Sequence, residues 1–252
     1  MRILVINPNT TASMTEKIGK AAASAAFAGT QIAAVNPKDG PPSIEGYFDE
    51  VFAIPGILAE MAGQEAADAY VIACFDDTGL DAARCATDAP VIGIGEAAFH
   101  MASLISGKFS VVTTLARSVP AIEHNLLKYG LASRCARVRA SDVPVLDLEK
   151  PGSDARHRIS DEIGRAVRQD HAEAIVLGCA GMADLASLLA QEHGVPVLDG
   201  VACAVKLAES LHALGLHTSK VGSYAAPRAK RFAGIYAPLS PGRGAKPDSS
   251  AA

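Results

Sequence analysis

The sequence predicts an α/β protein of two pseudo-symmetric domains, each a mostly parallel sheet flanked by helices, with the functional site in the cleft between them. Two observations predict this fold. Apolar runs rich in β-branched residues, at 68–74 and 173–179, each end in a cysteine, and such runs are typical of buried parallel strands. Landmarks around these runs recur in the same order, offset by 105 or 106 positions. The chain is therefore expected to contain two copies of one α/β unit.

Each copy begins with an opening strand and a cysteine strand. The opening strands are expected at residues 2–6 and 108–112, and each leads through a polar turn into a helix. The next strands end at Cys74 and Cys179, and each cysteine is followed by a small or acidic turn and a helical pattern. A thiol at the carboxyl end of a parallel strand lies where α/β folds bind ligands. Two such thiols predict a cleft with one thiol on each wall.

Each copy ends with a short strand and an alanine-rich helix. Pro90 and Pro196 open these strands, 106 positions apart. The helices are expected over residues 96–105 and 202–214. Chance can match a few alanines, but an ordered set of landmarks at a nearly constant offset indicates a duplication.

The tail from residue 218 is expected to pack back on the first unit. The sequence of this tail predicts one more strand at residues 220–224 and a short helix near Arg228. Its end is rich in turn formers and poor in core residues, which is typical of disorder. The expected division is a first domain of residues 1–95 and 215–236, a second domain of residues 96–214, and a disordered tail of residues 237–252.

The composition narrows the classes of function. The chain has 252 residues, a net charge of −4 and no basic tract that indicates nucleic-acid binding. No apolar stretch predicts a membrane span, and the first residues lack the apolar core of a signal peptide. Its five cysteines form no C-x-x-C pair and its seven histidines lack ligand spacing, so neither disulfides nor a metal site is predicted. A cytoplasmic location with reduced thiols is expected.

Two thiols that face one cleft suit acid–base chemistry at a carbon atom. A helix N-terminus lowers a thiol pKa from about 8.5, so the amides after Cys74 and Cys179 are expected to favour thiolate. One thiolate removes a proton beside a carbonyl, and the opposite thiol delivers one to the other face. Free amides at the turns would stabilise the carbanion oxygen, and no metal or organic cofactor is required. The alternative is that both are buried core cysteines, as we expect for Cys85, Cys135 and Cys203.

Six short segments also follow one another in a characteristic order. They are INPNT (6–10), SIEG (43–46), ACFDD (73–77), PVIGI (90–94), TTLARSVP (113–120) and GCAGM (178–182). The ordered set resembles the hydantoin racemases of the aspartate/glutamate/hydantoin racemase superfamily, from residue 1 to about residue 235. The chain departs from the family pattern at Thr78, where proline is expected, and at Glu96.

The resemblance implies both a fold and a reaction. It implies two pseudo-symmetric α/β domains and cofactor-independent racemisation of 5-monosubstituted hydantoins, with Cys74 and Cys179 as thiolate base and thiol acid on opposite faces of the ring. A small-molecule substrate and a homo-oligomer are implied, without a nucleic-acid or membrane partner. Allantoin, itself a 5-substituted hydantoin, is an alternative substrate. From other classes, a two-lobed binding protein without catalysis and a redox dithiol remain open.

Further residues near the cysteines are expected to contact the substrate. Asn9 would hydrogen-bond the ring or fix its own turn, and Ile44 lies in a loop that can reach over the cleft. Asp76 and Asp77 are expected to cap the helix that follows Cys74. The candidate substrate-binding residues are Asn9, Ile44, Phe75, Asp76, Thr113, Thr114, Gly178, Ala180 and Gly181.

Overall fold

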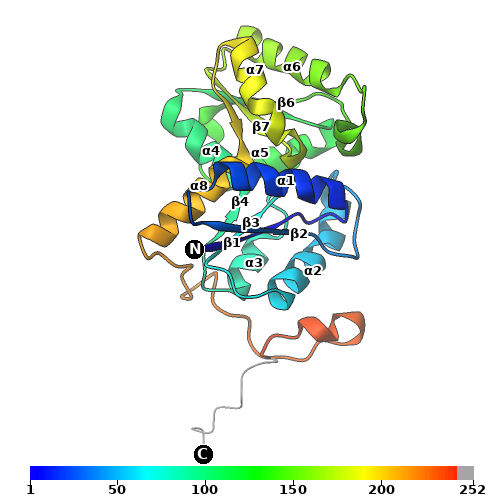
Figure 1. Cartoon of the computed structure of the whole chain (residues 1–252), viewed down its shortest axis with the longest axis vertical. Coiled ribbons are helices and arrows are strands. Elements are labelled where there is room, and N and C mark those ends of the chain that lie inside the picture. Colours follow the sequence, from blue (N-terminus) through cyan, green and yellow to red (C-terminus); the bar gives the residue numbers. More distant parts are fainter. Residues whose placement is uncertain (243–252) are drawn as a thin grey trace, which may run out of the picture.

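Two series of alternating strands and helices make up the protein in a computed structural model, which describes residues 1–242 (Figure 1). The first series is β1 (Arg2–Ile6), α1 (Ala12–Ala25), β2 (Gln31–Val35), α2 (Tyr47–Gly63), β3 (Ala69–Ile72), α3 (Leu80–Ala86), β4 (Val91–Gly93) and α4 (Ile94–Ile105). The second is β5 (Phe109–Thr113), α5 (Val119–Lys128), β6 (Cys135–Ala140), α6 (Ala155–Gln169), β7 (Ala174–Gly178), α7 (Ala186–His193), β8 (Val197–Asp199) and α8 (Gly200–Ala213). Short 3-10 helices are η1 (Ala116–Ser118), η2 (Ala132–Arg134), η3 (Val145–Glu149), η4 (Ala180–Leu185) and η5 (Gly234–Leu239).

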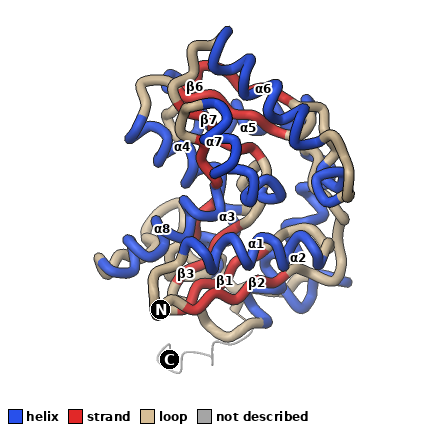
Figure 2. The backbone as a smooth tube through the Cα atoms, turned by 45° about the horizontal axis from the view of Figure 1, so that its top comes forward, coloured by secondary structure: helices blue, strands red, loops and turns tan. Residues whose placement is uncertain are grey.

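Each series builds its own four-stranded parallel sheet, and the two sheets have matching strand orders. The orders are β2-β1-β3-β4 and β6-β5-β7-β8. Figure 2 shows the sheets as separate layers with helices around them. Ile6 at the end of β1 pairs with Ile72 of β3, and Thr113 at the end of β5 pairs with Gly178 of β7. The predicted fold class of two pseudo-symmetric α/β domains is confirmed.

The structure contains one strand and one helix in each half that were not predicted from the sequence. They are β2 and α2 in the first half and β6 and α6 in the second. β2 and β6 each lie at one edge of their sheet, and most of their residues are only partly buried. β2 begins with the exposed Gln31, and β6 contains Arg137 and Arg139. A strand that is half open to solvent lacks the continuous apolar run that identifies a central parallel strand.

The predicted strand at residues 220–224 and the predicted helix near Arg228 are both wrong. After α8 the chain crosses the start of β4, where the N–H and the hydroxyl of Thr218 each donate to a carbonyl oxygen at 2.8 Å. Lys220 Nζ then donates to the Arg84 carbonyl oxygen at 2.6 Å. These contacts hold the segment across α3, so it does not run beside an edge strand.

The last described helix, η5, packs against α2 of the first half. The tail expected to be disordered, residues 237–252, therefore includes a placed part at 237–239. Residues 243–252 lie outside the described part of the chain. Across residues 1–242, no helix is both long and apolar enough to cross a bilayer.

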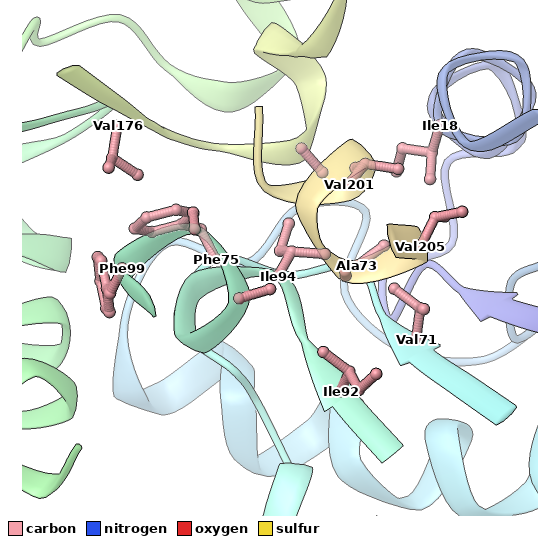
Figure 3. Close-up of a cluster of buried hydrophobic side chains, with 14 of the residues drawn as sticks. Ile18, Val71, Ala73, Phe75, Ile92, Ile94, Phe99, Val176, Val201 and Val205 are labelled. Carbon is pink, nitrogen blue, oxygen red and sulfur yellow. The ribbon is translucent and has the colours of Figure 1, made fainter. Parts of the chain in front are cut away.

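Helices α4 and α8 join the two halves. They pack on each other at their starts, where a Cβ on Gly200 would lie 2.5 Å from the carbonyl oxygen of Ile94. α4 also packs on β7 of the second sheet, whereas α8 packs on α1 and β3 of the first. Figure 3 shows the apolar cluster at this junction, with Ile94 and Val201 labelled. Each helix contacts both halves, so the division of the chain into domains stays a prediction.

Aromatic side chains connect the first cysteine turn to the second half. Phe99 of α4 is fully buried, and its ring centroid lies 5.3 Å from that of Phe75, 6.0 Å from Phe109 and 6.4 Å from Tyr129. Phe75 directly follows Cys74, Phe109 begins β5, and Tyr129 follows α5. Phe99 therefore packs the cysteine turn of one half against the other half.

Candidate active site

The two predicted cysteines line one pocket at the carboxyl ends of the two sheets. Cys74 follows β3 and Cys179 follows β7, and both are partly exposed. The space inside the pocket, with the solvent at its mouth included, is about 420 Å³. The lining residues come from both halves: Asn7, Pro8, Asn9, Met14, Ile44, Ala73, Cys74, Phe75, Asp76, Thr113, Thr114, Ser118, Val145, Gly178, Cys179 and Ala180.

The cysteines stand in equivalent turns. The N–H of Asp77 donates to the Cys74 carbonyl oxygen at 3.0 Å, and the N–H of Met182 donates to the Cys179 carbonyl oxygen at 3.1 Å. In each turn the N–H two residues after the cysteine lowers the pKa of the thiol. The repeated sequence therefore folds into two turns with matching backbones, one in each half.

The neighbours of Cys74 oppose its ionisation. Burial raises the pKa of the Cys74 thiol well above its usual range, and the carboxyl groups of Asp76 and Glu50 raise it further. The Thr78 hydroxyl, 3.4 Å from the Cys74 sulfur, lowers the pKa. The turn amides lower the thiol pKa as expected, but desolvation outweighs them, so the net shift is upward.

Cys179 has a cation in its surroundings. Burial raises the pKa of its thiol to about 11, and the carboxyls of Asp76 and Glu45 also raise it, whereas the N–H of Gly181 and the charge of Lys17 lower it. Lys17 Nζ, on α1, donates to the Gly181 carbonyl oxygen at 2.7 Å and pairs with Asp184 at 2.9 Å. Asp76 raises the pKa of both thiols, but Lys17 offsets this at Cys179, so Cys179 is expected to ionise more readily than Cys74.

Alkylation is therefore expected to be faster at Cys179 than at Cys74. Thiolate is the form that reacts with iodoacetamide, so the rate at Cys179 should rise about tenfold per pH unit below its pKa of about 11. The rate at Cys74 should stay lower at each pH, since Lys17 lowers the pKa of the Cys179 thiol, whereas the carboxyls of Asp76 and Glu50 raise that of Cys74. Timed quenching and peptide mass spectrometry measure both rates. Equal rates would contradict the charge difference between the two walls.

The two aspartates after Cys74 lie in different places, and the predicted capping of the next helix is wrong. α3 begins after Gly79 without a side-chain cap, whereas the Asp77 carboxylate accepts from N–H groups at the start of α4. Asp76 lines the pocket. Burial raises the pKa of Asp76 to about 8, and Glu50 adds to the rise. At neutral pH Asp76 is therefore mostly protonated.

The predicted substrate-binding residues line this pocket, with the exception of Gly181. The N–H of Gly181 instead lowers the pKa of the Cys179 thiol. Asn9 fixes its own turn, since its Oδ1 accepts from the Thr11 N–H at 2.9 Å and from Asn7 Nδ2 at 3.0 Å. The structure thus brings together, around the two thiols, Asn9, Ile44, Phe75, Asp76, Thr113, Thr114, Gly178 and Ala180.

The ends of β5 and β7 approach closely at the pocket. Thr113 Oγ1 donates to the Gly178 carbonyl oxygen at 2.9 Å. A Cβ on Gly178 would lie 2.7 Å from the Cβ of Thr113, closer than two carbon atoms can approach without a shift. Glycine before Cys179 therefore lets the cysteine strand lie against Thr113.

The loop that carries Ile44 is held to the opposite half. Ile44 is buried and lines the pocket. Its neighbour Glu45 accepts a hydrogen bond from the N–H of Val145, on η3, at 3.0 Å. Nearby, the Ser13 hydroxyl donates to the Glu149 carboxylate at 2.6 Å. The loop therefore covers one side of the pocket.

Some residues around the thiols were not predicted from the sequence. Met14 and Val145 line the pocket, and Lys17 and Glu50 lie near the cysteines. Met14 follows the polar turn of Asn9 by five residues, so helical periodicity from that turn was an available signal. The others come from elements that only tertiary packing brings to the site. Among residues 1–242, no group of three His, Cys, Asp or Glu side chains is arranged to hold a metal ion.

Comparison with known proteins identifies the family. The family model for Asp/Glu/Hydantoin racemase matches residues 3–208. The chain belongs to this family. It is 52% identical over 236 residues to a hydantoin racemase from Rhizobium meliloti, an alignment that covers 93% of this chain and 98% of that protein. The protein is thus an isomerase of the racemase class.

Solved structures of similar racemases have the same fold over nearly the whole chain. An allantoin racemase from Klebsiella pneumoniae superposes with a TM-score of 0.93 at 51% identity, covering 96% of this chain and 99% of that one. An allantoin racemase from Pseudomonas fluorescens superposes with a TM-score of 0.90 at 45% identity, covering 93% and 100%. This racemase is therefore similar to proteins named for two related substrates.

Proposed function

We propose that this racemase inverts 5-monosubstituted hydantoins without a cofactor, with Cys74 and Cys179 as base and acid on opposite faces of the ring. The observation that carries the proposal is the pair of thiols, one from each half, in matching turns at the ends of β3 and β7 and in one pocket. The hydantoin racemase that is 52% identical to this chain supports the substrate class.

The reaction requires one thiolate and one thiol. The thiolate takes the C5 hydrogen as a proton, and the C–H electron pair moves toward the C4 carbonyl to give an enolate. The opposite thiol then gives its proton to the other face of C5, so the ring leaves inverted and the two cysteines have exchanged protonation states. Burial raises the pKa of Cys179 to about 11, which makes its thiolate a stronger base than that of a free cysteine.

Main-chain N–H groups beside the thiols are available to the enolate oxygen. Phe75 and Ala180 line the pocket, and their N–H groups make no hydrogen bond within residues 1–242. Protonated Asp76 supplies a further O–H donor at the pocket wall. Donors held in place before the reaction stabilise developing negative charge without the cost of reorganising solvent.

Allantoin is a second candidate substrate. Two solved allantoin racemases share 45–51% identity with this chain, and the ureido substituent of allantoin needs polar partners. Asp76 is such a partner in the pocket, whereas Ile44, Phe75 and Val145 suit an alkyl or aryl substituent. The pocket thus contains a polar partner for a ureido substituent and apolar side chains for an alkyl or aryl substituent.

Polarimetry tests the proposed reaction. The purified protein is incubated without added cofactor with one enantiomer of 5-benzylhydantoin, 5-isopropylhydantoin or allantoin, and spontaneous racemisation in buffer is subtracted. We expect optical rotation to decay to zero, and the relative kcat/KM values rank the substituents. Binding of these compounds without any decay would contradict the proposal and favour a binding protein.

A further inference from the structure

The starts of α4 and α8 are equivalent in the repeat but are capped differently. The N-cap residue of α8, Asp199, accepts hydrogen bonds from the N–H groups of Val201 and Ala202, at 3.0 Å each. The N-cap residue of α4 is Gly93, which has no side chain. A carboxylate that stabilises the start of α4 must therefore come from elsewhere in the chain.

Asp77, in the first cysteine turn, supplies this carboxylate. Its Oδ1 accepts from the Gly95 N–H at 3.0 Å and its Oδ2 from the Glu96 N–H at 2.8 Å. These are the second and third residues of α4, the same positions that Asp199 caps in α8. Gly93 leaves room, since a Cβ there would collide with the Asp77 carboxylate. The cap of α4 is thus carried by the turn that holds the thiol.

The same carboxylate also contacts the second half. Tyr129, which follows α5, donates its hydroxyl to Asp77 Oδ2 at 2.8 Å. Asn125 of α5 donates to the Asp76 carbonyl oxygen at 2.8 Å, so α5 holds the turn at two points. The N–H of Asp77 donates to the Cys74 carbonyl oxygen at 3.0 Å. Asp77 is buried, with 6% of its surface exposed, and its carboxylate accepts three hydrogen bonds, from the N–H groups of Gly95 and Glu96 and from the Tyr129 hydroxyl.

The second cysteine turn lacks this link. At the position of Asp77 it has Met182, which is fully buried, and α8 is capped by its own Asp199. A local cap is thus sufficient to stabilise the equivalent helix. Helix stability alone therefore does not explain why the cap of α4 comes from the Cys74 turn. It also does not explain why the N-cap position of α4 is a glycine, which leaves room for the Asp77 carboxylate.

We propose that Asp77 is a positioning residue for Cys74: by capping α4 from the cysteine turn and accepting from Tyr129, it sets the place of the Cys74 thiol relative to the wall that carries Cys179. α4 packs on β7, the strand that leads to Cys179, so the link runs from one thiol wall to the other. The inference rests on the proposed function of the two cysteines.

Moving the cap of α4 from Asp77 to residue 93 distinguishes an effect on helix stability from an effect on the position of the Cys74 thiol. Asp77→Ala removes both the cap and the link, whereas Asp77→Ala combined with Gly93→Asp gives α4 a local cap like that of α8. We expect Asp77→Ala to lower Tm and to reduce kcat by roughly 10- to 100-fold with little change in KM, because small displacements of a reacting group have effects of this size. The double variant should recover Tm but neither kcat nor the wild-type alkylation rate of Cys74.

Two further variants serve as controls. Asp199→Ala removes a cap that is not attached to a cysteine turn, so it should lower Tm while kcat and the alkylation rate of Cys74 stay within about twofold of wild type. Tyr129→Phe leaves the cap of α4 in place and removes one hydrogen bond to Asp77. We expect it to change kcat and the Cys74 alkylation rate by about three- to tenfold, with a small change in Tm.

Recovery of kcat together with Tm in the double variant would overturn the proposal, because Asp77 would then act as a helix cap alone. An unchanged alkylation rate of Cys74 in both Asp77→Ala and Tyr129→Phe would overturn it as well. If the double variant does not fold, Tyr129→Phe decides the question. If the wild-type protein does not racemise hydantoins, the proposed function fails, and the alkylation rates of Cys74 still test the link separately.

Discussion

Replacing either Cys74 or Cys179 by alanine is expected to abolish racemisation of 5-substituted hydantoins while leaving the fold intact. Each face of the ring depends on one thiol for proton transfer, and removing such a group typically lowers the rate by roughly 10²- to 10⁴-fold. Both side chains are partly exposed at the pocket, so their loss leaves the buried core in place. Polarimetry with one enantiomer measures the rate, and thermal unfolding checks the fold.

The chain provides a matched control for these variants. Cys85, in α3, lies outside the pocket and its thiol donates to the Ser223 carbonyl oxygen at 3.6 Å. Cys85→Ala should therefore keep the wild-type rate. A single variant of Cys74 or Cys179 that still racemises at more than about a tenth of the wild-type rate would show that one thiol is sufficient.

Replacing Phe99 by alanine is expected to have the largest effect on stability. Phe99 is fully buried and contacts the rings of Phe75, Phe109 and Tyr129, which belong to both halves. Truncating such a residue leaves a cavity and costs about 3–5 kcal/mol. In a protein of this size that should lower Tm by roughly 10 °C. Because Phe75 follows Cys74, kcat should fall as well.

Leu104 on the same helix is the control for this prediction, since 79% of its surface is exposed. Leu104→Ala should change the free energy of unfolding by less than about 0.5 kcal/mol. Thermal and urea unfolding of both variants give the comparison. If Phe99→Ala proved as mild as Leu104→Ala, the aromatic cluster would not be what holds the two halves together.

The central strands and the duplication could be predicted from the sequence because their signals are local. β3 and β7 are buried continuous apolar runs, and the cysteine turns recur at a fixed offset. β2 and β6 carry no such signal, since they are edge strands open to solvent. The segment at 220–224 has the composition of a strand, but its contacts with α3 and with the residues before β4 hold it in an irregular path.

The sequence predicted the pocket residues that lie at strand ends, together with Ile44 in its loop. Cys74, Cys179 and the residues beside them follow strand ends, so the fold class alone places them together. The role of Asp77 was not predictable, because its partners lie 18 and 52 residues away in the sequence, on α4 and after α5. The direction of the thiol pKa shifts could not be predicted from the sequence either, since it depends mainly on burial, which follows from tertiary packing.

The position of solvent deuterium at low conversion tests the two-thiol reaction most directly. One enantiomer of 5-benzylhydantoin is incubated with the wild-type protein in D₂O, the enantiomers are separated on a chiral column, and mass spectrometry reads deuterium in each after subtraction of a no-enzyme control. Because one cysteine removes hydrogen and the other delivers deuterium, the inverted enantiomer should carry deuterium while the recovered substrate keeps hydrogen. Similar deuterium in both enantiomers, or hydrogen retained in the product, would indicate a single proton-transfer group and contradict this account.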